Sequence, residues 1–166
     1  MGEIDPGFDL WDKLAANKHH VLDLEVSRVL LFDDTSYPCW LVLVPMMDGL
    51  GHMHDLPEAH QLTLMKEINK CSKVLQDEWK TPKMNVAAIG NMCQVGLAPP
   101  PPPPSLSQVE PREDRRLTPP QQLHIHITCR HEKDPTWPGP CYGGALKKFE
   151  PEALEAMLAK LRGLLK

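Results

Sequence analysis

The chain has 166 residues, 42% of them hydrophobic, and a formal net charge of -4 at pH 7. This length suits one domain with a single core, and the negative charge disfavours general binding to nucleic acid. The five cysteines include no C-x-x-C pair, which argues against a disulfide framework or a zinc ribbon and favours a reducing compartment. No secretion signal and no stretch of about 20 apolar residues occurs, so we expect a cytoplasmic protein.

The first half of the sequence predicts a short helix, a strand pair and a long helix. "FDLWDKLAANKHH" is typical of a short helix with Phe8, Trp11 and Leu14 on one side. The strand-like runs 21–31 and 40–44, joined by "FDDTSYPC", predict an antiparallel hairpin. Residues 55–79 predict a long helix with Asp55 as its N-cap. One face of that helix is expected to carry its apolar residues Leu62, Met65, Ile68, Leu75 and Trp79.

The second half predicts two strands and a C-terminal helix around an irregular segment. "KMNVAAIGN" and "QLHIHITCR" are typical of strands, and residues 151–166 carry leucines at helical spacing that predict core packing. Between them lies a segment of Pro, Ser and charged residues with no period, in which Pro99–Pro104 predict polyproline II. The sequence therefore predicts an α+β domain interrupted by a disordered loop.

The strand "QLHIHITCR" carries an ordered polar row. Because residues two apart in a strand project to the same side, Gln122, His124 and His126 share one face and the intervening aliphatic residues face the core. A solvent-facing side of an edge strand would also explain the row. A shared Zn²⁺ would need a third ligand, and the other histidines show no recognisable ligand spacing. We therefore expect no metal and no cofactor.

Several motifs together resemble the histidine triad (HIT) family of nucleotide hydrolases and transferases. They are "LVLVP", the long helix, "NVAAIGN" and "QLHIHITCRHEKDPTWPGP", in this order. The likeness is greatest to the bacterial-type, diadenosine polyphosphate hydrolase-like branch, in which Gln-Leu-His-aliphatic-His precedes Asp-Pro-x-Trp-Pro-Gly-Pro, here residues 134–140. It covers about residues 8–143 apart from the proline-rich segment. It implies an antiparallel sheet with one long helix and a C-terminal helix.

The resemblance implies roles for the histidine strand. His124 takes the place of the family's nucleophile, which attacks the α-phosphate of a nucleotide derivative and forms a nucleotidyl-histidine that water hydrolyses. His126 would donate to the phosphate oxygens and is a candidate proton donor to the leaving group. Gln122 replaces the family's first histidine and can orient groups by hydrogen bonding, but it does not titrate. The leaving group could be a second nucleotide through a polyphosphate, an amine or sulfate.

Further positions are implied with alternatives. Asn91 would contact the phosphates or simply end its strand, and Asp33 or Asp34 would bind the ribose hydroxyls or cap a turn. Trp137 would border the site, or pack in the core or in a dimer contact. The histidine that many relatives carry after "VP" is missing here, unless His52 or His54 replaces it.

Two departures from the family pattern leave a second class of function open. With two family histidines replaced, the chain could be a nucleotide-binding or scaffold protein with little catalysis. Its proline-rich loop would then dock SH3, WW or profilin-type partners through Pro99–Pro104. Homodimerisation is common among similar proteins and is also expected.

The proline-rich segment divides the chain. We expect residues 1–94 and 122–166 to form a single HIT-like domain and residues 95–121 to be a disordered insertion. Deleting the insertion restores the length of the family segment. Its ends, Val-Gly and Pro-Pro-Gln, can be encoded by GTG-GG and a pyrimidine-rich stretch closing in CAG. These are marks of an intron, so a retained intron is our hypothesis for its origin.

Overall fold

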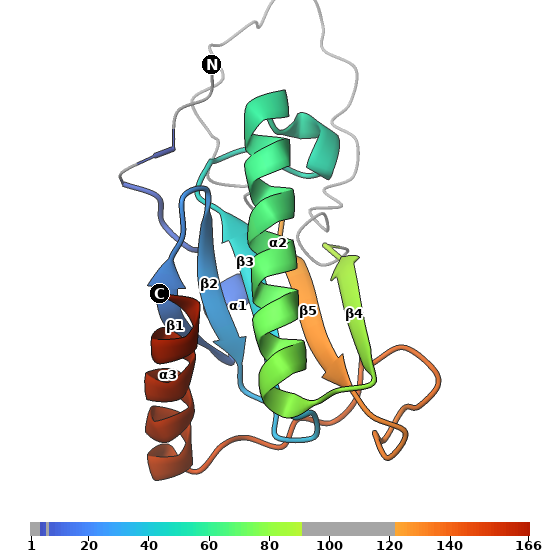
Figure 1. Cartoon of the computed structure of the whole chain (residues 1–166). Coiled ribbons are helices and arrows are strands. Elements are labelled where there is room, and N and C mark those ends of the chain that lie inside the picture. Colours follow the sequence, from blue (N-terminus) through green and yellow to red (C-terminus); the bar gives the residue numbers. More distant parts are fainter. Residues whose placement is uncertain (1–3, 6, 91–121) are drawn as a thin grey trace, which may run out of the picture.

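The computed structural model describes residues 4–5, 7–90 and 122–166. Within them a five-stranded sheet has the order β1-β2-β3-β5-β4, with every neighbouring pair antiparallel (Figure 1). The predicted α+β class is confirmed. The strands are β1 (Lys18–Asp23), β2 (Ser27–Phe32), β3 (Trp40–Pro45), β4 (Lys83–Ala88) and β5 (Ile125–Arg130).

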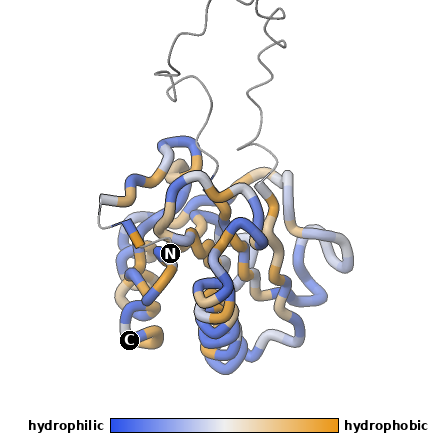
Figure 2. Tube along the Cα trace, turned by 90° about the horizontal axis from the view of Figure 1, so that it is seen from above, coloured by the Kyte–Doolittle hydropathy of each residue, from blue (hydrophilic) through white to orange (hydrophobic). Residues whose placement is uncertain are grey.

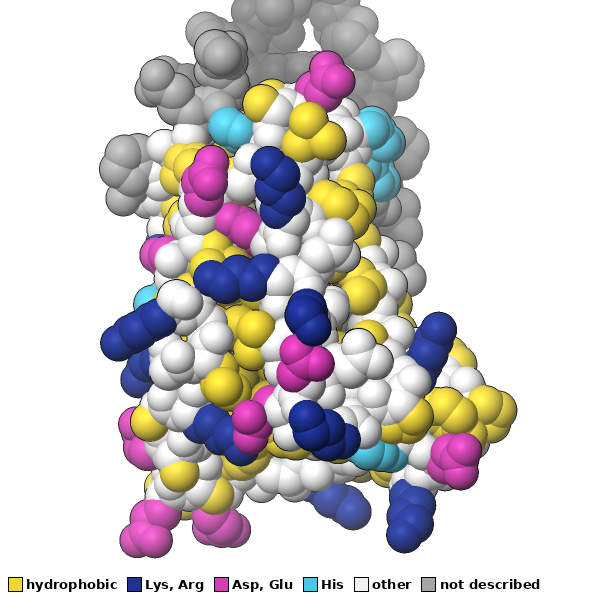
Figure 3. Space-filling model, in the orientation of Figure 1, with side chains coloured by type: hydrophobic (Ala, Val, Ile, Leu, Met, Phe, Trp, Pro, Cys, Tyr) yellow, Lys and Arg dark blue, Asp and Glu magenta, His cyan; other side chains and the backbone are white. Residues whose placement is uncertain are grey.

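The two long helices cover one face of this sheet. α2 (Glu58–Trp79) and α3 (Pro151–Leu165) bury leucines, isoleucine and cysteine in one cluster with inward side chains of β1, β2, β3 and β5. Figure 2 looks along α2 and shows this helix and the sheet as separate layers. Figure 3 shows the solvent side of α2 carrying charges of both signs. None of the described helices combines the length and apolarity needed to span a membrane.

The opposite face of the sheet is covered by the N-terminal segment and by the chain that follows β5. A second apolar cluster there joins Phe8, Leu14, Trp40, Val42 and Cys141 with their neighbours. α1 (Asp12–Ala15) is much shorter than the helix predicted for residues 8–20, because residues 18–20 belong to β1. This second face is the one toward which His126 points, since His126 pairs directly with Val42.

The strand-like run 21–31 is two strands and not one. β1 and β2 form an antiparallel pair, and the Leu24 amide closes the turn between them on the carbonyl of Ser27. The buried Glu67 carboxylate of α2 accepts hydrogen bonds from the Val26 amide at 2.8 Å and the Ser27 hydroxyl at 2.6 Å. The turn is therefore tied to the helix by a contact between distant parts of the chain. The predicted hairpin of β2 with β3 is confirmed.

The start and the buried face of α2 also differ from the prediction. Its N-cap is Pro57, whereas Asp55 belongs to a short 3₁₀ helix, η1 (Met53–Asp55), and accepts the amides of Gly51 and His52. Leu62 and Met65 are 61% and 48% exposed. The predicted Ile68 and Leu75 are buried, and the other buried positions are Leu64, Glu67 and Cys71.

Asn91 and residues 95–121 lie outside the described residues. The strands on either side of them are adjacent, with Ala88 of β4 opposite Ile125 of β5. Antiparallel neighbours need only a short connection, which residues 89–94 and 122–124 are long enough to form. The topology therefore does not require the proline-rich segment.

Candidate functional site

The structure brings His124 and His126 together at the start of β5, on the sheet face away from α2. Their ring centroids are 5.3 Å apart at an interplanar angle of 68°. The residues are only 7% and 8% exposed, so water has little access to either imidazole. Gly90 lies beside the pair, because a Cβ on this glycine would be 3.8 Å from His124 Cε1.

His124 is held as a neutral imidazole by a hydrogen bond between its ring and the backbone. Its Nδ1 lies 2.9 Å from the Gln122 carbonyl oxygen, which can only accept, so Nδ1 carries the proton and Nε2 a lone pair. Burial lowers the pKa of His124 below its usual value; the bond to Gln122 opposes this and the positive charge of Lys18 adds to it. At neutral pH His124 therefore has the form that a nucleophile needs.

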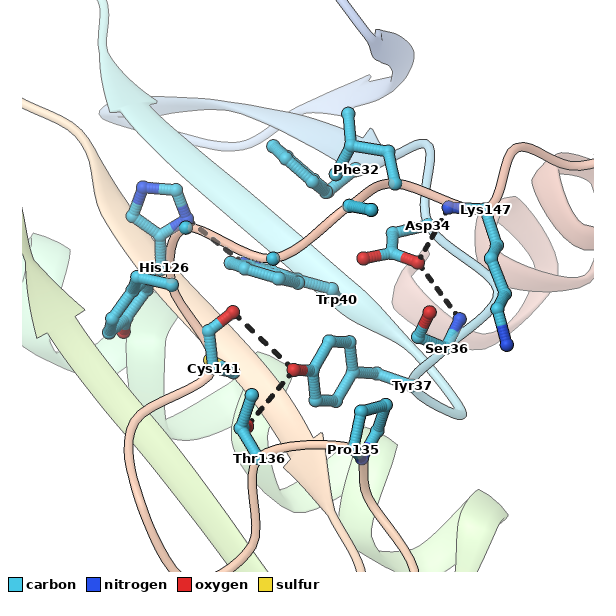
Figure 4. Close-up of a pocket in the computed structure, with 15 residues that line it drawn as sticks. Phe32, Asp34, Ser36, Tyr37, Trp40, His126, Pro135, Thr136, Cys141 and Lys147 are labelled. Carbon is cyan, nitrogen blue, oxygen red and sulfur yellow. Dashed lines mark hydrogen bonds between the residues drawn. The ribbon is translucent and has the colours of Figure 1, made fainter.

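His126 also forms a hydrogen bond through its Nδ1, but there the nitrogen accepts. The indole Nε1 of Trp40 donates to His126 Nδ1 across 2.9 Å (Figure 4). Burial, with smaller contributions from His124 and Lys18, lowers the pKa of His126 to about 3. His126 is therefore uncharged throughout the neutral range.

An aromatic cavity of about 370 Å³ opens beside His126 (Figure 4). Trp40 lies in the middle of its aromatic wall. The Trp40 ring stacks on Phe32 at a centroid distance of 4.4 Å and meets Tyr37 and Tyr142 edge-on at 5.3 and 5.7 Å. Flat apolar walls of this kind suit a planar ring such as a nucleobase. The turn and strand pattern of residues 32–40 did not predict this cavity, although the close spacing of Phe32, Tyr37 and Trp40 was a signal for it.

The two aspartates after β2 both cap backbone, and one of them also borders the cavity. Asp33 Oδ1 accepts the Phe149 amide at 2.9 Å. Asp34 Oδ1 accepts the amides of Ser36 and Lys147 at 2.9 and 3.3 Å. Only Asp34 is among the residues that line the aromatic cavity. Asp34 thus caps the local turn through Ser36 and borders the cavity, whereas Asp33 binds the backbone of a distant segment at Phe149 and its Oδ2 lies 3.5 Å from His19 Nε2.

The side-chain amide of Gln122 is bonded to the backbone of the N-terminal segment. Its side-chain Oε1 accepts the Trp11 amide at 2.9 Å and its Nε2 donates to the Asp9 carbonyl at 2.7 Å. Both ends of the amide therefore hold the N-terminal segment against the sheet. The group of Gln122 that bonds to His124 is its backbone carbonyl, whereas its side-chain amide anchors the N-terminal segment.

Lys18 of β1 is a charged group near the two histidines that no sequence motif indicated. Its ammonium group lies 5.1 Å from the Phe32 ring centroid and donates to the Leu14 carbonyl at 2.7 Å. Its charge lowers the pKa of both His124 and His126, which places a cation near the pair. A cation at this place would attract the phosphate of a ligand.

The remaining predicted residues separate into near and distant ones. His52 and His54 stack at 5.1 Å and line a second cavity, of about 290 Å³, that reaches His124. Trp137 does not line either of these cavities; Arg130 lies over its ring at 5.7 Å. In the part of the chain that the structure describes, no three His, Cys, Asp or Glu side chains are placed to hold a metal ion.

The fold is similar to crystal structures of bacterial histidine triad proteins. The protein from Bradyrhizobium japonicum matches with a TM-score of 0.74 and 30% identity, over 97% of this chain and 100% of that chain. The protein from Marinobacter aquaeolei VT8 matches with 0.75 and 31%, over 95% and 96%. The protein from Sinorhizobium meliloti 1021 matches with 0.74 and 25%, over 96% and 98%. No protein-family profile matches the sequence, and no curated protein matches it.

Proposed function

The chain belongs to the histidine triad family, and from that premise we propose that it is a nucleotide phosphohydrolase or nucleotidyl transferase that acts through His124. The observation that carries the proposal is the bond from His124 Nδ1 to the Gln122 carbonyl, which puts the ring proton on Nδ1 and the lone pair on Nε2, with the buried ring of His126 at a centroid distance of 5.3 Å. The substrate would be a nucleotide derivative of the dinucleoside polyphosphate or phosphoramidate type.

The reaction would proceed in two displacements at the α-phosphorus. In the first, His124 Nε2 forms a bond to phosphorus, and the bond to the leaving group breaks with its electron pair going to that group. In the second, water attacks the phosphorus and the N–P bond returns its pair to Nε2, which regenerates neutral His124; the surplus proton of the water passes to solvent. Division of one difficult substitution into two easier ones is what a covalent intermediate provides.

The surroundings of His124 supply binding for each part of such a substrate. The aromatic cavity would take the base, and the second carboxylate oxygen of Asp34 would accept from a ribose hydroxyl. His126 would donate to a phosphate oxygen, and Lys18 would balance the phosphate charge. Loss of one donor in sites that stabilise developing charge costs about 3 kcal/mol, so His126 is expected to matter for rate as well as binding.

The proposal is tested by incubating the chain, with and without residues 95–121, with AMP-linked anhydride and amine substrates in the presence of a chelator. We expect AMP release that the chelator does not affect and that His124→Ala abolishes. His131→Ala, a histidine outside the site, is the matched control and should keep full activity. If neither form releases AMP, and Gln122→His does not either, the second reading of a nucleotide-binding or scaffold protein with little catalysis is favoured.

The insertion and the partners form a separate part of the proposal. We propose that residues 95–121 derive from a retained intron, which sequencing of the mature transcript tests; presence of all their codons in the dominant message would refute it and favour docking of SH3, WW or profilin-type partners.

We also propose a homodimer, supported by β4, an edge strand of the described sheet whose Val86 is 47% exposed. Sedimentation equilibrium should show a dimer that Val86→Lys converts to monomer.

A further inference from the structure

We propose that Trp40 is a positioning residue for the reaction proposed above: its indole N–H fixes His126 as the neutral tautomer with the proton on Nε2, so that His126 serves the phosphate as a hydrogen-bond donor and not as an acid. The effect of Trp40 on catalysis rests on the proposed function, whereas the tautomer of His126 is inferred from the contacts of Trp40 and His126 alone.

The direction of the bond between these residues follows from the chemistry of indole. The Nε1–H of tryptophan can donate but cannot accept, and 2.9 Å is a normal length for a hydrogen bond between ring nitrogens. His126 Nδ1 must therefore present its lone pair to Trp40. Because a neutral imidazole carries one N–H, the proton of His126 is on Nε2.

Trp40 is held too firmly to turn away from His126. It is 4% exposed, stacks on Phe32 at an interplanar angle of 25°, and meets Tyr37 at 90°. The sheet register adds to this, because Trp40 pairs with Thr128 and Val42 with His126, which makes Trp40 and His126 diagonal neighbours on one face. Strand pairing and aromatic packing thus set the direction of the indole N–H.

The two histidines are consequently locked in opposite tautomers. His124 has its proton on Nδ1, bonded to the Gln122 carbonyl, and a lone pair on Nε2. His126 has its lone pair on Nδ1, bonded to Trp40, and its proton on Nε2. One ring can therefore attack phosphorus while the other donates to a phosphate oxygen, and neither has to change its protonation before the reaction begins.

His126 is unable to exchange a proton in the neutral range. Gain of a second proton would place an N–H on Nδ1 against the N–H of Trp40, in a buried site where the charges of Lys18 and His124 also disfavour a cation. The Tyr142 ring lies edge-on to His126 at 5.6 Å, and Asp34 lines the same cavity. Loss of the Nε2 proton would leave an imidazolate. The expectation that His126 protonates the leaving group is therefore replaced: a leaving group that needs a proton must take it from another source.

The test combines a spectroscopic measurement with kinetics on the full chain. Two-dimensional ¹H–¹⁵N correlation of the histidine rings, with the His126 signals identified by their loss in His126→Gln, should show a bare Nδ1 and a protonated Nε2 at neutral pH. In Trp40→Phe, which keeps an aromatic ring but removes the donor, we expect a mixture of tautomers and a His126 that titrates at higher pH. Trp79→Phe is the matched control and should leave the His126 signals unchanged.

The kinetic arm separates positioning from folding. Trp40→Phe should lower kcat about tenfold or more, yet by less than the roughly 10²- to 10³-fold cost of losing a donor outright, while KM changes little. A proton on Nδ1 of His126 in the wild-type protein would overturn the inference even if the variant fails to fold. So would a Trp40→Phe protein with an unchanged tautomer. Because the spectrum needs no turnover, an inactive wild-type protein would refute the proposed function and leave this test intact.

Discussion

Replacement of Gln122 by alanine separates an anchoring role from a catalytic one. The side chain is 4% exposed and makes two hydrogen bonds, at 2.9 and 2.7 Å, to the backbone of Trp11 and Asp9. The bond that orients His124 uses the Gln122 carbonyl and is retained in the variant. Each lost hydrogen bond is worth about 1 kcal/mol, so Gln122→Ala should lower the free energy of unfolding by about 2 kcal/mol.

This loss corresponds to a fall in Tm of about 4 to 8 °C for a chain of this size. Urea unfolding followed by circular dichroism measures the change in the free energy of unfolding. A separate assay measures kcat on an AMP-linked substrate, which should stay within about twofold of wild type. Gln61→Ala is the matched control, because Gln61 donates one hydrogen bond to the Leu56 carbonyl and its loss should cost about half as much. Unchanged stability with a tenfold loss of kcat would refute the anchoring role and return Gln122 to catalysis.

Four further predictions concern charges at the site. Asp34→Asn should raise KM about tenfold for ribonucleotides and leave KM for 2′,3′-dideoxy analogues unchanged, because one charge-assisted hydrogen bond is lost. Lys18→Gln should raise KM by a similar factor and flatten its dependence on ionic strength, and it should raise the pKa of both histidines. Because the pKa of His124 is lowered, kcat/KM should stay constant as pH falls through about 6.5 and decline only in more acidic solution. Because His126 stays neutral to about pH 3 when folded but takes a proton near 6.5 when unfolded, it should lower stability progressively as pH falls through that window; His126→Gln should flatten the decline.

Much of the fold follows from periodicity. The pairing of β2 with β3, the strands around residues 83–88 and 125–130, and the helix ending at Trp79 were all within reach of the sequence. The split of run 21–31 was not, because the turn at Val26 is stabilised by Glu67, which is forty-one residues away. Leu62 and Met65 were assigned to the wrong face, since an apolar residue on a helix says nothing of which side the sheet occupies.

The site was predictable where it is a strand motif and unpredictable where it depends on tertiary contacts. Alternation placed His124 and His126 on one side of the strand, and the structure brings their rings together. The same alternation suggested that Gln122 would face the phosphate, but its amide is occupied by backbone of the N-terminal segment. The bond from Trp40 crosses between two strands 86 positions apart in sequence, so no local pattern could indicate it.

The most direct test of the central claim is detection of the covalent intermediate. The chain is mixed with an AMP-linked substrate, quenched within the first turnovers, digested and analysed by mass spectrometry. The proposal predicts an adenylyl group on the peptide that contains His124, absent from His124→Ala and present, though formed more slowly, in Trp40→Phe. Substrate turnover with no such adduct, or an adduct that persists in His124→Ala, would contradict the assignment of His124 as the nucleophile.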